Sequence, residues 1–246
     1  MIYKISFFLV SLFSVATLQA QLTAGFETNL NFGLAYNSGN TNSSDLDFGF
    51  DSKRIKENHE LIIAGSYEYG QQEQTDDEGN DSRETNLDRS KIEAQSNWLI
   101  SNMTYSFINI NGERDEKADI EYRVNAGPGL GYYFYRNDDR TLSTEGSVVY
   151  LMESVSDEES EYFAFRLGQK FEQKLGDNAK IWQAFEGVLQ FDDTDNFYIN
   201  FEVGAEASLT ERLGLRVVAK DKYNNAPAAD VEKNDFTLIT GISLKI

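Results

Sequence analysis

Apolar and polar residues alternate along most of the chain, in stretches of about ten residues separated by polar turns. In FETNLNFGLAY (26–36), Leu30 and Phe32 lie on one face, and Asn29 and Asn31 lie on the other. A spacing of two residues is that of a β-strand, because apolar positions of an amphipathic helix recur every three to four residues. The pattern predicts an all-β fold of about twelve antiparallel strands, with each strand end uncertain by about two residues.

The apolar row of each predicted strand stays free of charge in mid-strand. In FYINFEVGAEASL (197–209), for example, Phe201 and Val203 flank Glu202, which lies on the opposite face. A soluble β-sandwich or a lipocalin-like barrel also alternates in this way. The alternation alone therefore does not decide whether the apolar row meets a protein core or lipid.

The connections and the number of strands favour lipid. Longer, mostly acidic connections are expected near 70–86, 111–118, 153–160 and 224–234, and shorter ones near 99–102, 135–140, 173–179 and 210–213. If the N-terminus is periplasmic, all the long connections are extracellular, as in outer-membrane barrels. A barrel of about twelve strands with its apolar face inward would enclose a void that this chain cannot fill. We therefore expect residues 21–246 to form one transmembrane β-barrel in the outer membrane of a Gram-negative bacterium.

Large side chains extend the expected lipid-facing row at several places. MTYSF (103–107) places Tyr105 and Phe107 on this row, and Ile120 begins it in the stretch 120–134. Aromatic residues such as Trp98 lie near the ends of their rows, where interfacial girdles form in membrane barrels.

The N-terminus has the pattern of an export signal. Lys4 is followed by an apolar run from Ile5 to about Leu18 and then by small residues, which predicts a secretory signal peptide over 1–20 with cleavage after Ala20. A retained N-terminal anchor is the alternative, although the run is short for a membrane helix.

The face opposite the apolar row is expected to line the lumen, and it carries both signs of charge. The lumen-lining charges are predicted to be Asp45, Asp47, Arg89, Lys91, Glu93, Glu121, Arg123, Arg166, Lys170, Glu186, Glu202, Glu206, Arg216 and Lys220. They are compatible with a lattice of ion pairs that rigidifies the barrel. They are also compatible with a narrow pore that conducts small ions or solutes, for which no single ring of charge indicates a selectivity.

The stretch GPGLG (127–131) is unusual for a strand, because Gly127, Gly129 and Gly131 share the lumen face while Pro128 and Leu130 point outward. Inward glycines leave room for bulky neighbours or for curvature, and Pro128 removes a ladder hydrogen bond. This pattern favours a packing role over a ligand site.

The expected outer loops are acidic, and the whole chain has a formal net charge of -19. Acidic loops keep a protein soluble during export, and they can also bind divalent cations weakly, although DDEGND (76–81) lacks the spacing of an EF-hand. The expected partners are outer-membrane lipid and lipopolysaccharide, with the barrel-assembly machinery during biogenesis. Binding to nucleic acid is not expected, because the charge has the wrong sign.

The sequence suggests no catalytic residue, cofactor or resident metal. His59 is the one histidine, and the chain has no cysteine. A lipid-active enzyme would need a serine beside His59 at the membrane rim, and no predicted strand presents one clearly. We therefore do not expect an enzyme.

Several motifs in order resemble a known family. The hairpin LAYNSGNTNSSDLDFGFD (34–51), the stretch AGPGLGYYF (126–134), VVYLMES and the closing strand are similar to the putative salt-induced outer-membrane protein family, whose function is unassigned. The resemblance covers residues 23–246 and implies an outer-membrane barrel that is structural or related to salt or osmotic stress. It transfers no binding residues.

The last stretch, FTLITGISLKI (236–246), keeps its apolar row to the final residue. A closing strand must pair with the first strand, so it cannot fray as chain ends usually do. It differs from the usual end of an outer-membrane barrel, because the last residue is Ile246 and not an aromatic one.

Overall fold

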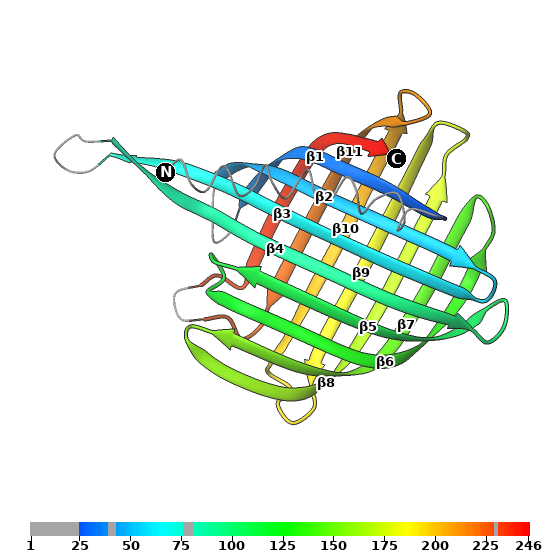
Figure 1. Cartoon of the computed structure of the whole chain (residues 1–246). Coiled ribbons are helices and arrows are strands. Elements are labelled where there is room, and N and C mark those ends of the chain that lie inside the picture. The colour runs from blue at the N-terminus through cyan, green and yellow to red at the C-terminus, as the bar shows by residue number, and fades with distance from the viewer. Residues whose placement is uncertain (1–24, 39–42, 76–80, 229–230) are drawn as a thin grey trace.

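The computed structural model describes residues 25–38, 43–75, 81–228 and 231–246. These residues form a closed antiparallel barrel of twelve strands, in which each strand pairs with its neighbours in sequence and β1 pairs with β12 (Figure 1). The strands are β1 (Phe26–Ser38), β2 (Ser43–Lys56), β3 (His59–Thr75), β4 (Asp81–Leu99), β5 (Thr104–Asp115), β6 (Ile120–Arg136), β7 (Arg140–Val155), β8 (Glu158–Lys174), β9 (Ala179–Gln190), β10 (Phe197–Ser208), β11 (Leu213–Asn224) and β12 (Asn234–Lys245). The predicted fold class is confirmed, and the predicted signal peptide lies outside the described residues.

The barrel closes along the first and last strands. Leu30 pairs with Leu244 and Phe32 with Ile242, so the apolar rows of β1 and β12 lie side by side. The backbone N–H of Ile246 donates to the carbonyl of Thr28 at 2.9 Å. The apolar row thus reaches the end of the chain because the final residue still takes part in closure.

Three of the connections predicted to be long, near 70–86, 111–118 and 153–160, are in fact mostly strand, and in the first β3 continues to Thr75 and β4 begins at Asp81. β7 and β8 continue through the acidic stretch 153–160 and meet in a tight turn, where Ser156 and Asp157 have φ angles of 53° and 62°. Left-handed angles at both central residues are typical of the type I′ hairpin, whose twist matches that of paired strands. β5 likewise continues to Asp115, which leaves 116–119 as the turn. Acidity therefore did not distinguish loops from strand ends.

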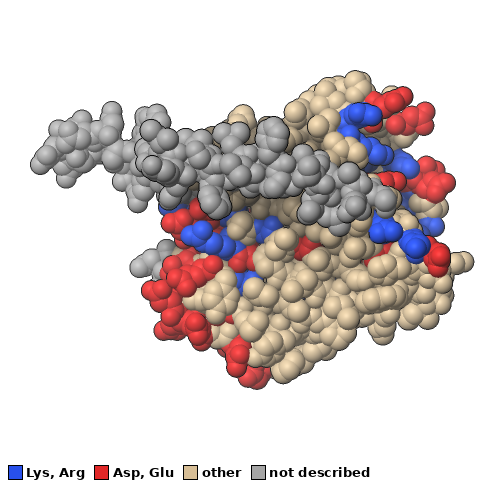
Figure 2. Space-filling model, viewed as in Figure 1, with Lys and Arg blue, Asp and Glu red and all other residues tan. Residues whose placement is uncertain are grey.

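The outward rows of the barrel wall are apolar. Leu130, Ile92 and Phe163 are 62%, 57% and 56% exposed, respectively, and they belong to different strands. Uncharged residues cover much of the visible wall in Figure 2, while Asp and Glu gather at both ends, including the end that carries the β5–β6 and β7–β8 turns. Within the described ranges, no helix is long and apolar enough to cross a membrane.

The structure corrects the predicted orientation of three apolar side chains. Tyr105 and Phe107 point into the barrel and are 1% exposed, whereas Ile108 and Ile110 form the outward row of β5. Ile120 is also inward and 5% exposed, because a register shift between Ile120 and Tyr122 interrupts the alternation. When a strand carries apolar residues on both faces, its sequence does not show which face points outward.

The inward glycines of β6 explain how large rings fit inside. A Cβ on Gly129 would collide with the ring of Phe107, and one on Gly131 would collide with the ring of Tyr105. The β6–β7 ladder is interrupted at Gly127 and Pro128, between the pairs Ala126–Tyr150 and Gly129–Ser147. Gly129 and Gly131 thus make room for the side chains of the neighbouring strand.

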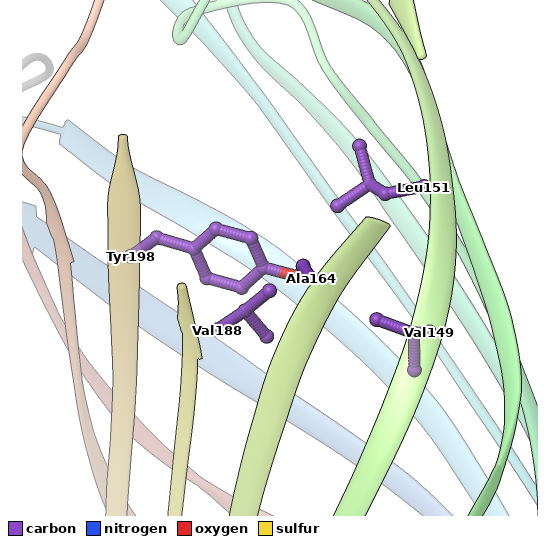
Figure 3. Close-up of a cluster of buried hydrophobic side chains, with 5 residues drawn as sticks. All are labelled: Val149, Leu151, Ala164, Val188 and Tyr198. Carbon is purple, nitrogen blue, oxygen red and sulfur yellow. The ribbon is translucent and has the colours of Figure 1, made fainter. Parts of the chain in front are cut away.

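Apolar clusters fill part of the interior beside these rings. Val149 and Leu151 of β7 pack with Ala164, Val188 and Tyr198 of the next three strands. The ring of Tyr198 points towards Ala164 and Val188 (Figure 3). The β5–β10 side of the barrel therefore contains a partial core.

Candidate lumen site

A cavity of about 350 Å³ lies inside the barrel. Its lining comes from strands β1 to β4 and β8 to β12, and among the described residues none of β5, β6 or β7 lines it. The inward rings of Tyr105, Phe107 and Tyr133 occupy the β5–β6 side instead. The cavity is therefore displaced towards one side of the barrel.

Most of the predicted lumen charges line this cavity. They are Asp47, Arg89, Lys91, Glu93, Arg166, Lys170, Glu186, Glu202, Arg216 and Lys220. Both signs occur in comparable numbers, although the whole chain is strongly acidic. The cavity is thus close to neutral, while the excess negative charge lies elsewhere in the chain.

The structure places the other predicted charges apart from the cavity. Asp45 is buried in β2 and accepts a hydrogen bond from Nδ2 of Asn37 at 2.8 Å. Arg123 pairs with Glu153, with 2.6 Å between Nε and Oε2. Glu206 pairs with Lys180 on the neighbouring strand, with 3.8 Å between Oε1 and Nζ.

Glu121 is not brought into the lumen cavity. It lies in the irregular stretch of β6 between Ile120 and Tyr122, is exposed, and accepts a hydrogen bond from Oγ of Ser154 at 3.2 Å. The extra residue of a bulge shifts the side-chain alternation by one, and sequence alternation alone does not show where this happens.

One ion pair joins opposite walls of the barrel. Lys222 of β11 pairs with Glu113 of β5, and these strands are six places apart in the ring of twelve. Lys222 also lies 3.8 Å from Oδ2 of Asp115, and Lys220 lies 3.4 Å from Oε1 of Glu68 on β3. Side chains of β11 therefore reach across the lumen near the end with the acidic turns.

Arg89 is the centre of this group. Its Nε donates to Oδ2 of Asp115 at 2.5 Å, and its terminal nitrogens lie 3.6 Å from carboxylates of Glu68 and Asp235. We call Glu68, Arg89, Glu113, Asp115, Lys220 and Lys222 the cross-lumen network. Because all its carboxylates and cations have partners, the network avoids the large penalty of an unpaired buried charge.

A second group of charges lies beside the aromatic rings. Arg166 donates from Nε to Glu186 at 2.6 Å and from Nη1 to Glu145 at 3.2 Å. Glu145 also accepts hydrogen bonds from the hydroxyl of Tyr105 at 2.8 Å and from Nε2 of Gln95 at 2.7 Å. These contacts join β4, β5, β7, β8 and β9 through a single carboxylate and its guanidinium partner.

The sequence prediction missed several members of the cross-lumen network. Glu113 and Asp115 lie in a stretch that was assigned to an acidic loop, whereas the structure extends β5 through it. Glu68 could have been predicted from the sequence to face the lumen, because it lies between the outward Tyr67 and Tyr69 in a strand with clear alternation. Lys222 similarly shares the inward face of β11 with Lys220.

Metal ligation has no geometric support in the part of the chain that the structure describes. There, no group of three or more His, Asp or Glu side chains is placed to hold a metal ion. Residues 76–80, which include most of the acidic stretch considered for cations, lie outside that part.

A serine does lie beside the single histidine, contrary to the expectation from sequence. Nε2 of His59, the first residue of β3, is 2.7 Å from Oγ of Ser96 on β4. From the sequence, no serine was clearly placed beside His59, because the contact depends on the register between β3 and β4.

A closed barrel of consecutive antiparallel strands, with apolar outward rows and a charged interior, has the architecture of outer-membrane porin-type barrels. A family model described as "Protein of unknown function, DUF481" matches residues 30–245, so the chain belongs to this family. Comparison with curated proteins gave no significant match.

Solved structures resemble the barrel in shape. The NanC porin shares 8% identity at a TM-score of 0.58, with 88% of this chain and 100% of the porin covered. The outer-membrane phospholipase of Salmonella typhi shares 12% identity at a TM-score of 0.49, with 88% and 90% covered. At 8% identity the likeness to the NanC porin shows a common fold and no common function.

Proposed function

We propose that this protein is a barrel of the Gram-negative outer membrane whose lumen is a narrow, weakly selective path for small ions, with a structural or salt-stress role. The apolar outward rows support membrane insertion, because a closed barrel satisfies its backbone hydrogen bonds within lipid. Lipid and lipopolysaccharide are then its surroundings, and the assembly machinery handles it during biogenesis.

The observation that carries the pore proposal is the cross-lumen network. The Lys222–Glu113 pair joins opposite strands, so only a path for small ions remains between the walls. Fixed charges of both signs line the cavity next to it, which favours neither cations nor anions strongly. The path is therefore narrow and weakly selective.

The same network supports a link to salt. The distance over which charges are screened falls from about 8 Å at 0.15 M salt to about 3 Å at 1 M. Ion pairs in a cavity open to water are weakened by that screening, so the side chains of Lys222 and Glu113 separate more often as salt increases. Conductance is then expected to rise more steeply than in proportion to salt concentration.

Single-channel recording in planar bilayers tests this proposal. The wild-type protein is compared with a Glu113→Gln/Lys222→Met double variant, which removes one acid and one base from the network. The double variant is expected to conduct several-fold better and in proportion to salt. A Lys180→Met/Glu206→Gln double variant, which removes a wall pair between adjacent strands, serves as the control and should behave like the wild type. The absence of resolved openings at any voltage, in all three proteins, would leave a purely structural role.

A dedicated channel for small solutes is the second candidate. It is supported by the cavity of about 350 Å³, and by the fold shared with the NanC porin. Swelling of protein-containing liposomes in sugar solutions separates the two candidates, because a path limited to small ions admits no sugar.

A further inference from the structure

The outward wall of β2, β3 and β4 carries a group of polar side chains at the end with the short turns. Nε2 of His59 lies 2.7 Å from Oγ of Ser96, and His59 is the one histidine of the chain. Ser96 pairs with Leu61 in the ladder, so it is diagonal to His59 on the same face. A histidine nitrogen at this distance from a serine hydroxyl has the geometry of a general base beside a nucleophile.

The depth of the Ser96–His59 contact in the membrane can be inferred from Trp98. Trp98 pairs with His59, its ring centroid is 5.6 Å from that of His59, and it is 44% exposed. Tryptophan on an outward row near a strand end marks the interface between hydrocarbon and headgroups. The ester bonds of phospholipids lie at this interface, so Ser96 is at the depth of the bond that a lipase cleaves.

One cation, Lys56, lies beside His59, and Arg54 lies further along the same outward face of β2. Lys56 pairs with His59, and Arg54 pairs with Leu61, which in turn pairs with Ser96. Side chains directly opposite in a ladder are about 5 Å apart at Cβ, so Lys56 lies beside His59 and, two strands from Ser96, its long side chain can reach the phosphate of a lipid bound there. The guanidinium of Arg54 instead lies over the ring of Phe26 on β1, 5.6 Å from its centroid. Lysine and arginine are the side chains that bind phosphate groups.

We propose that Ser96 and His59 hydrolyse acyl ester bonds of phospholipids in the periplasmic leaflet of the outer membrane, with Lys56 binding the lipid phosphate. This inference rests on the membrane placement in the proposed function, and it departs from the sequence-based expectation of no enzyme. The apolar residues on the membrane side of Ser96, such as Ala94 and Ile63, contact the acyl chains.

The reaction balances without a further reagent. Oγ of Ser96 attacks the ester carbonyl while its proton passes to Nε2 of His59, and a tetrahedral oxyanion forms. Collapse breaks the bond to the glycerol oxygen, which takes the proton from His59 and leaves as lysophospholipid. Water, deprotonated by His59, then releases the fatty acid from Ser96 and restores both side chains.

The test uses the full mature protein in vesicles of phosphatidylethanolamine and phosphatidylglycerol, with lysophospholipid and fatty acid measured by mass spectrometry. The wild type is expected to release both products in equal amounts. Ser96→Ala and His59→Gln are expected to reduce release to the level of protein-free vesicles. Ser90→Ala, which alters another outward serine of β4, is the matched control and retains activity. Lys56→Gln is expected to raise KM several-fold more than it lowers kcat.

A second measurement does not depend on the choice of lipid. A fluorophosphonate reagent should form an adduct on Ser96, located by peptide mass, and His59→Gln should prevent it. If vesicles with inserted wild-type protein yield no lysophospholipid and no adduct forms, the contact is only a cross-strand hydrogen bond and the inference is overturned. Flotation of the same samples separates the two proposals, since protein that does not float with the vesicles contradicts the membrane placement as well.

Discussion

Gly131 and Tyr105 show how single residues determine the interior of this barrel. The ring of Tyr105 lies over Gly131, and its hydroxyl donates to Glu145 at 2.8 Å. A large aromatic side chain can bury itself inside the barrel here because the neighbouring strand has no side chain at the point of contact. The glycines of β6 are thus explained by packing, as the sequence indicated, although the rings they accommodate were expected on the other face.

Gly131→Ala is therefore expected to destabilise the barrel by about 1–3 kcal/mol, because the added methyl group overlaps ring atoms of Tyr105 that cannot move freely. Urea unfolding in lipid vesicles measures the change. Gly146→Ala is the control: its Cβ would lie 3.7 Å from the nearest atom, a ring carbon of Phe165. Equal effects of the two substitutions would contradict the packing explanation.

Arg166 is the residue on which the second group of charges depends. Its side chain is 3% exposed and holds both Glu145 and Glu186. Removing one partner of a buried ion pair lowers the stability of the fold more than removing both, because the remaining buried charge has no opposite charge beside it.

Arg166→Met is expected to destabilise the barrel by about 3–5 kcal/mol, since two carboxylates remain buried without their cation. The same unfolding measurement applies. Arg212→Met, at an exposed position of a short turn, should change stability by less than about 0.5 kcal/mol. A triple variant that also replaces Glu145 and Glu186 by glutamine should recover part of the loss, and no recovery would argue against the ion-pair explanation.

At the scale of elements, β12 is the strand on which closure depends. Leu244 pairs with Leu30 on one side and with Leu213 on the other, and the backbone N–H of Lys245 donates to the carbonyl of Arg212 at 2.8 Å. These contacts confirm the sequence-based expectation that the last strand pairs with the first.

Deletion of residues 244–246 is expected to lower the fraction of protein that assembles into membranes, because it removes the last pairs with both neighbours of β12. Resistance of the folded barrel to protease in isolated outer membranes reports that fraction. A Leu244→Val/Ile246→Val variant keeps the chain length and the apolar row, so it should assemble normally. Normal assembly of the truncated protein would mean that the end of the apolar row of β12 faces outward but is not needed for closure.

The strands also show where alternation is informative and where it is not. Strands with one apolar and one polar face, such as β10, were oriented correctly from the sequence. In β5 both faces carry apolar residues, so the sequence placed Tyr105 and Phe107 on the wrong side. The tight turn at Ser156 and Asp157 was missed because its residues are acidic and polar like those of a true loop.

At the scale of the whole molecule, the barrel inverts the usual distribution of residues. Charged pairs and a cavity lie inside, and the outward rows expose large apolar side chains such as Phe32, Leu34 and Tyr36 on a single strand. Soluble monomers rarely expose continuous apolar surface of this extent. Lipid is the surrounding that matches this wall.

The purified mature protein is accordingly expected to require detergent, and to aggregate when the detergent is diluted below its micelle concentration. Light scattering during dilution measures this directly. Addition of phospholipid vesicles during the dilution should prevent aggregation, because the apolar wall then inserts. A protein that stayed monomeric without detergent would contradict the membrane assignment.

The sequence by itself determined the strand period, the number of strands and most of the residues on each face, because side-chain alternation is a local property of an extended chain. It did not determine which charges meet. Glu113 and Lys222 are 109 positions apart, and they come together only because closure places β5 opposite β11. The contact of Ser96 with His59 was not predicted, because it depends on the register between two strands. Closure and register are set by the pairing of all twelve strands together, and this cooperative result could be read only from the tertiary structure.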